Sequence, residues 1–552
     1  MPKKNSDNLI ESVAQKWTLD ETQKHAFKLI TTHACKSNPR QMKLFLSGSA
    51  GSGKSQVIRA LQDFFAIKQE SRRLRLTAYT GIAAININGI TLHSALNLNI
   101  CSNKKRPSSK TLQELRALWT GVDYLFIDEI SMISCEFLLR ISDALIQATG
   151  IPEPFGGINI IFAGDLCQLP PINETRLSCE IKQYNNPLSE RTQRKLKGRA
   201  LWLSTDYVII LTGNSRQTGP ANERFRQLLA RLRHGCCSDD DYRLLSSRIM
   251  SHCTTPTSLN DFAMAPVIVS DNITKDQLNC AFSRRFAHAT KQQLVWYIAE
   301  DTIDGKLVSD DTTHGRLLNA LHSGHTNHRL RKLPLVIGMP VMITHNVCVE
   351  AGVVNGTIGT IHSLTYVQHA DGTRSLSSCI VKLPGKNNVS IGNLEPNLFP
   401  ILPDVVSFTF KHSSHLTVSV TRKQCPIVPA FAMTAHKAQG QTMEKAIIDL
   451  ESCSGTEAPY VMASRVKSLD GLLILRPFDK KKIRCNSSED TRKEERRLKS
   501  MHDNTIHQIT TGLTSKRPFD LTEPSPDTPA LKKRRSDAPT EHPSSLLTHN
   551  NN

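Results

Sequence analysis

The segment from Lys43 to Leu61, KLFLSGSAGSGKSQVIRAL, constrains the fold of this chain more than any other part of the sequence. It starts with a short apolar run, Leu44–Leu46, of the kind that forms a buried parallel strand. Residues 48–55 then match the pattern G-x-x-x-x-G-K-[ST], and apolar residues at helical spacing follow from Val57. A strand, a glycine-rich loop and a helix in this order are the setting of a phosphate-binding loop. The segment therefore predicts a nucleotide site on a parallel sheet.

The chemistry of this loop follows from its residue types. In such a loop, successive backbone N–H groups surround phosphate oxygens, and the start of the helix adds a partial positive charge. The N–H groups here would come from the loop residues Gly48, Ser49, Ala50, Gly51, Ser52 and Gly53. Lys54 can reach the β- and γ-phosphates, and the Ser55 hydroxyl can bind Mg²⁺. A loop that only turns the chain is the alternative, and the flanking strand and helix favour nucleotide binding. We expect ATP or GTP to bind here with Mg²⁺.

The length and charge of the chain limit its organisation and its partners. A chain of 552 residues is long enough for two or more domains with sizeable cores. Its formal net charge is +19, and residues 480–552 hold 15 Lys/Arg against 10 Asp/Glu, so most of the excess lies in the rest of the chain. This charge indicates a polyanionic partner, although a basic protein without such a partner can have the same composition.

Cysteine usage and hydropathy indicate where the chain resides. Its 14 cysteines form no C-x-x-C pair and no Cys/His spacing of the zinc type, which favours reduced thiols inside a cell. Residues 1–17 lack the apolar segment of a signal peptide, and no apolar run approaches the roughly 20 residues that cross a bilayer. We expect a soluble intracellular protein without membrane contacts.

A second apolar run ends in paired carboxylates. Residues 123–131 read DYLFIDEIS, a buried strand that leads into Asp128 and Glu129. Because the carboxyl ends of parallel strands face the ligand crevice, we expect Asp128 to hold Mg²⁺ and Glu129 to polarise the attacking water. An apolar run before Asp-Glu is common, but its place about 75 residues after the phosphate loop supports this interpretation.

Other polar positions suit a nucleotide or a nucleic acid less specifically. Gln23, in a predicted helix upstream of the loop, can bond both the donor and the acceptor of an adenine edge, although most helix glutamines are simply solvated. Residues 79–84 and 89–94 offer small and hydroxyl side chains to a backbone phosphate, although ordinary turns have the same composition. Gln168 follows a predicted strand at 158–162 and could sense the γ-phosphate.

Strands and helices alternate from residue 40 to 211, which predicts an α/β domain with a parallel sheet. The pattern then begins again without a second phosphate loop, with strands expected at 266–270, 340–344, 446–450 and 471–475 and a helix at 430–440. Beyond residue 478, charge, Ser and Pro predict disorder. We expect a flexible N-terminus at 1–14, a first domain at 15–205 and a second domain in two pieces, at 206–350 and 426–478. An inserted small β-barrel-like domain is expected at 351–425, and a disordered basic tail at 479–552.

The order of the motifs resembles that of superfamily 1 DNA helicases. These motifs are TGIAA, GITLHS, FIDEIS, PFGGINIIFAGDLCQLPP, RQTGPANERFRQLLARLRHG, VVNGTIGTI, TAHKAQGQT and YVMASRVKSLDGL. The chain is most similar to the petite-integration-frequency (PIF-type) branch, which includes the helicase halves of Helitron transposons. The resemblance covers about residues 15–478. It implies two RecA-like domains with ATP between them and single-stranded DNA across their tops.

The resemblance also implies roles for individual residues. It implies that Gln23 contacts adenine and that Lys54 and Ser55 bind phosphate and Mg²⁺. It also implies that Asp128 is a metal partner, Glu129 the general base and Gln168 the γ-phosphate sensor. Two arginines, Arg216 and Arg465, are implied to reach the γ-phosphate from the second domain. DNA contacts are implied for Thr80, His93, Thr434, His436 and Lys437.

The resemblance implies an ATP-dependent DNA helicase that moves 5′ to 3′ along single-stranded DNA and unwinds duplex junctions. We expect the protein to be a monomer. Replication, repair, recombination and telomere maintenance all remain open as its pathway. One alternative is another phosphate-loop ATPase, such as a clamp loader, but it would not need a second half with Arg465. The other is a non-enzymatic DNA-binding remnant of a transposon helicase, against which the intact charged residues argue. About sixteen residues precede the first motif, so we expect the two-histidine nuclease half of a Helitron protein to be missing.

The C-terminal segment holds two short basic clusters, at 516–517 and 532–535, on either side of a Pro-containing spacer. Such clusters on disordered chain are recognised by nuclear import receptors or by nucleic acid, and a solvated tail without a role is the alternative. We expect Lys532–Arg535 to act as the import signal and the nucleus to be the location, with the mitochondrion as the alternative.

Overall fold

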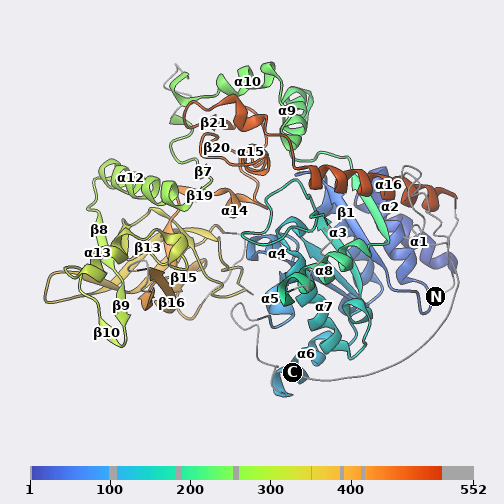
Figure 1. Ribbon diagram of the computed structural model, residues 1–552, viewed down its shortest axis with the longest axis horizontal. Helices are drawn as coiled ribbons and strands as arrows, with labels where there is room; N and C mark the ends of the chain where they lie inside the picture. Colours follow the sequence, from blue (N-terminus) through green and yellow to red (C-terminus); the bar gives the residue numbers. More distant parts are fainter. Residues whose placement is uncertain are drawn as a thin grey trace, which may run out of the picture.

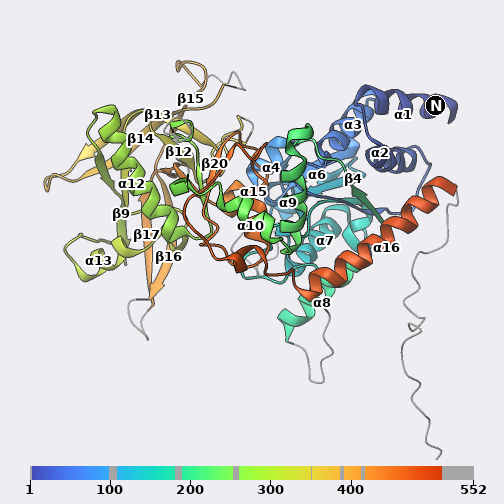
Figure 2. The same ribbon diagram turned by 90° about the horizontal axis from the view of Figure 1, so that it is seen from above.

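The computed structural model describes residues 3–98, 109–180, 189–252, 260–349, 351–385, 391–411 and 417–511. Two domains with parallel sheets lie next to each other, and a β-rich part extends from the second domain (Figures 1 and 2). This arrangement confirms the predicted α/β class with two parallel-sheet domains and a β-rich insertion.

The first domain is built on six parallel strands in the order β3-β2-β4-β5-β1-β6. They are β1 (Lys43–Gly48), β2 (Leu74–Ala78), β3 (Ile90–Thr91), β4 (Tyr124–Asp128), β5 (Asn159–Gly164) and β6 (Tyr207–Leu211). Because side chains alternate along a strand, Leu44 and Leu46 pack in one apolar layer and Phe45 in the other. Both faces of the sheet are thus covered, which is why its strands read as apolar runs in the sequence.

Helices form these two covering layers. One layer holds α1 (Lys3–Lys16), α2 (Glu21–Ala34), α3 (Lys54–Ile67) and α4 (Gly81–Asn86), and the other holds α5 (Leu92–Ala95), α6 (Ser109–Trp119), α7 (Cys135–Thr149) and α8 (Glu190–Leu203). The prediction of a flexible N-terminus at 1–14 is therefore wrong for the helical part. Ile10, Val13 and Ala14 recur at helical spacing and are buried against the first layer.

The predicted boundary between the domains at 205/206 is also wrong. Strand β6 pairs in parallel with β1, with Tyr207 opposite Leu44 and Leu211 opposite Gly48. It therefore completes the first sheet, and the chain leaves the first domain only after Leu211. A strand's partners are set by long-range hydrogen bonds, so the alternation of strands and helices could not assign β6 to a sheet.

The second domain has four parallel strands in the order β19-β7-β20-β21. Its strands are β7 (Val267–Val269), β19 (Ala432–Thr434), β20 (Ala446–Ile448) and β21 (Leu472–Ile474), and its helices are α9 (Glu223–His234), α10 (Asp239–Ser246), α12 (Asn272–Thr290), α14 (Ala435–Ala438) and α15 (Glu457–Ala463). Residues 430–440, predicted as one helix, instead form β19 and the single turn α14. The β19 backbone pairs with β7, and this pairing overrides the helical reading of an alanine-rich sequence.

The β-rich insertion is larger than the predicted range of 351–425. It begins at β8 and ends with β18, and contains β8 (Val295–Ile298), β9 (Glu300–Ile303), β10 (Lys306–Leu307), α13 (Thr313–Ala320), β11 (Lys332–Leu335), β12 (Pro340–Ile343), β13 (Ile358–Gln368), β14 (Arg374–Lys382), β15 (Leu398–Ile401), β16 (Asp404–Lys411), β17 (Thr417–Gln424) and β18 (Ile427–Pro429). The strand expected at 340–344 belongs to this part, because β12 pairs antiparallel with β13 and β18. Strand β9 likewise pairs with β17.

The predicted disordered tail from residue 479 is wrong up to Thr511. Helix α16 (Glu489–Thr511) runs back from the second domain along the open edge of the first sheet (Figures 1 and 2). There the N–H of Val208 donates to Thr505 Oγ1 and the N–H of Ile210 donates to His502 Nδ1, each at 3.2 Å. The helix thus covers the edge strand β6, whose outward backbone groups would otherwise be unpaired. Its charged sequence hides this role, because few of its buried residues are apolar.

No helix within the described ranges is long and apolar enough to cross a membrane. The basic cluster Lys532–Arg535 lies outside the described residues, as does the rest of the chain after Thr511.

Candidate active site

The phosphate loop lies between the carboxyl end of β1 and the start of α3. Two glycines give it its shape, because Gly51 and Gly53 have φ angles of 85° and 86°, which favour glycine. A Cβ at Gly53 would also lie 2.2 Å from Gln23 Nε2. Gly53, Lys54 and Ser55 at the start of α3 line the cavity described below, where their backbone N–H groups can meet an anion.

Lys54 is anchored within the loop. Its Nζ donates to the carbonyl oxygens of Gly48 and Ser49, at 2.6 and 3.1 Å. Burial lowers the pKa of Lys54, while the nearby carboxylates of Asp128 and Asp165 act to raise it. The lysine is thus a desolvated donor next to two acids, the setting in which a phosphate oxygen competes well for its N–H groups.

The paired carboxylates end β4, as the sequence predicts. Burial and the neighbouring Glu129 raise the pKa of Asp128, and Lys54 opposes this shift. Glu129 itself has a left-handed backbone, with φ 56° and ψ 46°, which non-glycine residues seldom adopt. Its Oε2 accepts a hydrogen bond of 2.8 Å from Nε2 of Gln439 in the second domain.

A cavity of about 630 Å³ separates the two domains at this point. It brings together most of the predicted nucleotide residues, and its lining includes Ala50, Gly51, Ser52, Gly53, Lys54, Ser55, Asp128, Glu129, Gln168, Arg216 and Arg465. Gln168 is buried, and its Oε1 has no hydrogen-bond partner among the described residues. The cavity therefore joins an anion-binding loop, two acids and two arginines.

Gln23 lies behind the loop and is not among the cavity's lining residues. Its Oε1 accepts from the N–H of Asp20 at 3.1 Å, as part of the capping box that starts α2. Its Nε2 faces the carbonyl oxygen of Ser52 at 3.5 Å. In this conformation Gln23 supports the loop, and the adenine contact stays a prediction.

The two arginines reach the cavity from different places. Arg465 follows α15, and its Nε donates to Val461 O at 2.8 Å. Arg216 does not come from the second domain, as the resemblance implied, because it follows β6 and the adjacent Ser215 N–H donates to Gly51 O at 2.7 Å. Its Nη1 crosses the cleft to Ser464 O at 2.8 Å. Burial lowers the pKa of both guanidinium groups, which indicates desolvated cations that an anion would stabilise.

The predicted DNA-contacting residues divide between the two domains. Thr80 is the N-cap of α4, where its side chain accepts from the N–H of Ala83. Lys437, in α14, donates to Asn355 Oδ1 on a turn of the insertion. That turn packs against α4, since a Cβ on Gly81 would lie 2.7 Å from Val354 Cβ. Thr80 and Lys437 are thus brought to the same surface by a turn whose role the sequence did not show.

The remaining three predicted DNA residues lie in other surroundings. The ring of His93 stacks on Phe137, with 5.0 Å between the ring centroids. Thr434 is buried at the start of α14. His436 lines a separate cavity of about 390 Å³ together with Pro170 and Pro171 of the first domain.

Four residues without a predicted role connect the cavity to the rest of the protein. They are Asp165, Arg233, Gln439 and Tyr460, and each bonds across the domain boundary. All four stand inside motifs that the sequence displays, but contacts between residues hundreds of positions apart leave no local signal.

Comparisons with known proteins agree with this arrangement. The profile of the PIF1-like helicase family matches residues 18–243. The ATP-dependent DNA helicase PIF1 of Xenopus laevis is 28% identical over 452 residues, which cover 80% of this chain and 60% of that protein. The chain therefore spans about 60% of the length of this curated relative.

Solved structures show the same fold. The crystal structure of the Pif1 helicase from Candida albicans matches 87% of this chain and 99% of its own, with a TM-score of 0.60 and 23% identity. The Bacteroides Pif1 helicase in complex with ADP-AlF3 and ssDNA matches 87% of this chain and 97% of its own, with a TM-score of 0.61 and 22% identity. Its ordered motifs, its two parallel-sheet domains and these matches make the chain similar to PIF1-like helicases, in sequence over residues 18–243 and in fold over most of the chain.

Proposed function

We propose that this protein is an ATP-dependent DNA helicase that couples ATP hydrolysis to movement along single-stranded DNA. The observation that carries the proposal is the cavity between the domains, where Lys54, Glu129 and Arg465 meet. A phosphate loop alone would serve many ATPases. Here the loop lies beside an acid of its own domain and faces an arginine from a second parallel-sheet domain. This arrangement suits an enzyme in which hydrolysis and domain closure are linked.

The residues present fit a nucleoside triphosphate. The loop N–H groups and Lys54 supply donors, and phosphate binding would replace the bonds that Lys54 makes to Gly48 and Ser49. Gln168 Oε1 has no partner among the described residues and can accept a hydrogen bond at the cavity, so Gln168 suits a water bound at the terminal phosphate. Ser55 and Asp128 would hold Mg²⁺, which neutralises phosphate charge when bound.

Glu129 would orient and polarise the attacking water, and Gln439 would hold its carboxylate in place. Arg465 and Arg216 would stabilise the charge that develops on the transferred phosphoryl group. Arginines in this role raise turnover by about 10³- to 10⁵-fold in other phosphate-loop enzymes.

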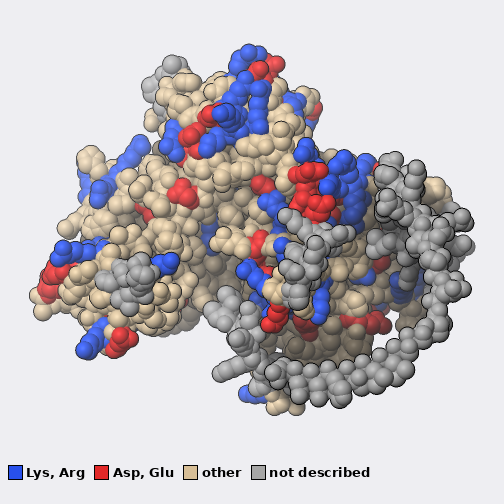
Figure 3. Space-filling model, viewed as in Figure 1, with Lys and Arg blue, Asp and Glu red and all other residues tan. Residues whose placement is uncertain are grey.

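Single-stranded DNA is the partner that we propose for the surface shared by α4, α14 and the turn at Asn355. The relatives are named DNA helicases, and two solved structures with the same fold contain ssDNA. Lys and Arg lie among Asp and Glu on the face seen in Figure 3, so that face shows no single-sign surface. We also propose 5′-to-3′ movement, as the family resemblance implies.

Hydrolysis of ATP that depends on single-stranded DNA tests the function. We expect the wild-type protein to show it, Lys54→Ala to lose it while keeping most of its DNA affinity, and Lys36→Ala, an exposed lysine, to match wild type. DNA affinity should fall steeply with salt and vary little with base sequence, since phosphate contacts release counterions and carry no base information. DNA binding without any ATPase activity would instead support the non-enzymatic alternative.

We also propose a nuclear location, supported by the basic cluster at 532–535 in the sequence. A reporter fused to residues 510–552 should accumulate in the nucleus and lose that accumulation when 532–535 are replaced by Ala. Cytoplasmic localisation of the reporter, or nuclear accumulation that persists after the substitutions, would contradict this proposal without affecting the helicase proposal.

A further inference from the structure

Tyr460 joins the second domain directly to the phosphate loop. It lies in α15 and is 3% exposed. Its hydroxyl accepts a hydrogen bond from the N–H of Ala50 at 3.1 Å and donates one to Asp165 Oδ2 at 3.2 Å. A single phenol oxygen therefore bridges the loop that would hold phosphate and an acid at the end of β5.

The charge of Asp165 determines the direction of these bonds. Asp165 is fully buried, and burial raises its pKa, but Arg233, with help from Lys54 and the N–H of Cys167, holds the pKa below its usual range. Arg233 Nη2 lies 2.7 Å from Asp165 Oδ1. An ionised Asp165 can only accept, so the Tyr460 hydroxyl must donate to it and turns a lone pair toward Ala50.

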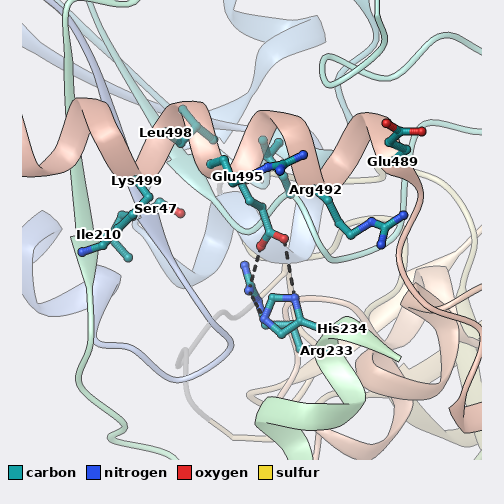
Figure 4. A pocket seen from close by; sticks show the side chains of 11 residues that line it. Ser47, Ile210, Arg233, His234, Glu489, Arg492, Glu495, Leu498 and Lys499 are labelled. Atoms are coloured by element: carbon teal, nitrogen blue, oxygen red, sulfur yellow. Dashed lines mark hydrogen bonds and ion pairs between the residues drawn. The ribbon is translucent and has the colours of Figure 1, made fainter. Parts of the chain in front are cut away.

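Arg233 is itself held by α16. Glu495 points from that helix toward Arg233 and His234, as Figure 4 shows. Arg233 Nη1 donates to Glu495 Oε1 at 2.9 Å, and His234 Nδ1 lies 3.5 Å from Glu495 Oε2. The C-terminal helix thus fixes the arginine that keeps Asp165 ionised.

The side chains around Arg233 include residue types that bind metal ions, but the charge of Arg233 makes the cluster unfavourable for a cation. The ligand atoms of Cys167, His234 and Glu495 lie within 4.8 Å of one another. The guanidinium of Arg233 lies 2.9 Å from Glu495 and 3.1 Å from His234 Nε2, so its positive charge opposes a cation there. The cluster is better explained as the support of Asp165.

Tyr460 and Arg465 are carried by one short segment. Arg465 lies five residues after Tyr460, and its Nε is bonded to Val461 O in α15. The place of its guanidinium relative to the phosphate loop is therefore set by how α15 docks on the first domain. Arg216 and Gln217 also bond the segment after α15, at Ser464 O and Val466 O. Among the hydrogen bonds of the described residues, the one from Ala50 to Tyr460 joins the second domain to the loop itself.

We propose that Tyr460 is a positioning residue, which sets the distance between the phosphate loop and Arg465 through its bonds to Ala50 and Asp165. This inference rests on the proposed ATPase function. Tyr460→Phe keeps the packed ring and removes only the hydroxyl. Because small misplacements of a catalytic group are costly, we expect kcat for ATP to fall roughly 10- to 100-fold. The KM for ATP should change less, because the loop N–H groups and Lys54 remain.

The matched control is Tyr242→Phe. Tyr242 lies in α10, and its hydroxyl donates to Phe478 O at 3.4 Å, away from the cavity. We expect this variant to match wild type in kcat and KM. Asp165→Asn keeps the size of the side chain and removes its charge, and it should reproduce the kcat loss of Tyr460→Phe. Agreement between the two variants would show that the loss does not arise from some other effect of Tyr460→Phe.

A double variant separates positioning from a general loss of structure. If Tyr460 acts through Arg465, adding Tyr460→Phe to Arg465→Ala should lower the residual kcat less than about twofold, because the group to be positioned is gone. The same factor in both backgrounds would overturn the inference.

Hydrogen exchange tests the contact without relying on hydrolysis. Amides in peptides covering 48–55 should exchange faster in Tyr460→Phe than in wild type or Tyr242→Phe. If wild type hydrolyses ATP but Tyr460→Phe matches it in kcat and in exchange, the inference fails and the proposed function stands. If wild type lacks ATPase activity, the proposed function fails, and unchanged exchange in Tyr460→Phe would then overturn the contact as well.

Discussion

Gln439 of the second domain donates a hydrogen bond of 2.8 Å to Oε2 of Glu129 in the first. The same Nε2 donates to Ser131 Oγ at 3.2 Å, so two acceptors hold the amide in place. Gln439 follows α14 directly, and α14 carries His436 and Lys437, both predicted to contact DNA. A shift of α14 on binding DNA would thus move the group that orients the predicted general base.

Removing this amide should reduce the stimulation of ATPase activity by DNA. We expect Gln439→Ala to lower kcat at saturating single-stranded DNA by about tenfold, part of the 10²- to 10⁴-fold that a positioned base supplies. The rate without DNA should change less. Steady-state turnover with and without oligonucleotide measures both, with Gln292→Ala at an exposed position as control. Equal stimulation in Gln439→Ala and wild type would contradict the role.

Arg465→Ala should keep nucleotide affinity and lose hydrolysis. Its charge is needed when the phosphoryl group is transferred, so we expect kcat to fall by about 10³-fold or more. Binding of a fluorescent ATP analogue and single-turnover hydrolysis separate the two effects. Arg243→Ala removes an exposed pair with Asp240 and should be neutral. Collapsed affinity with normal turnover of bound ATP would show that Arg465 is a binding residue.

Helix α16 should be needed for the stability of the first domain. Glu494 is buried and accepts from Arg199 Nη2 at 2.8 Å and from Trp202 Nε1 at 2.7 Å. Glu494→Ala removes the carboxylate that pairs with the buried Arg199, which typically costs about 3–5 kcal/mol. Urea denaturation should show this loss in the free energy of unfolding. Glu489→Ala, at an exposed position on the same helix, should change it little. Equal stability of the two variants would mean that α16 does not stabilise the domain.

DNA affinity should fall as the pH rises through 8. Burial and the neighbouring Lys275 lower the pKa of Lys437 to about 8, so this lysine loses its charge between pH 7 and 9. A phosphate favours the charged form, so affinity should decline by at most about tenfold per pH unit above the pKa. Fluorescence anisotropy at constant ionic strength measures it. Lys437→Arg stays charged and should show a flatter profile. Identical profiles would exclude Lys437 as a phosphate contact.

Local signals were enough for the phosphate loop and the acids. Glycine is favoured at the positive φ angles of Gly51 and Gly53, and the apolar runs of β1 and β4 mark strands that are buried on both faces. These features depend on residues close together in the chain, so the sequence predicted Lys54, Asp128 and Glu129 in one place without a structure.

Tertiary structure decided which sheet each strand joins. Strand β6 joins β1, and strands from 295 onward join the insertion, because hydrogen-bonded partners far apart in the chain determine sheet membership. Helix α16 shows the same limit, because its buried Glu494 reads as surface charge until Arg199 and Trp202 are seen beside it.

The contacts between the domains were the features that the sequence could least predict. The bond from Ala50 to Tyr460 joins residues 410 positions apart, and that from Gln439 to Glu129 joins residues 310 apart. The sequence by itself determined the chemical groups of the site, because each belongs to a short motif with its own local geometry. Only the folded chain decided how those groups hold one another, because a hydrogen bond depends on distances that packing of the two domains creates.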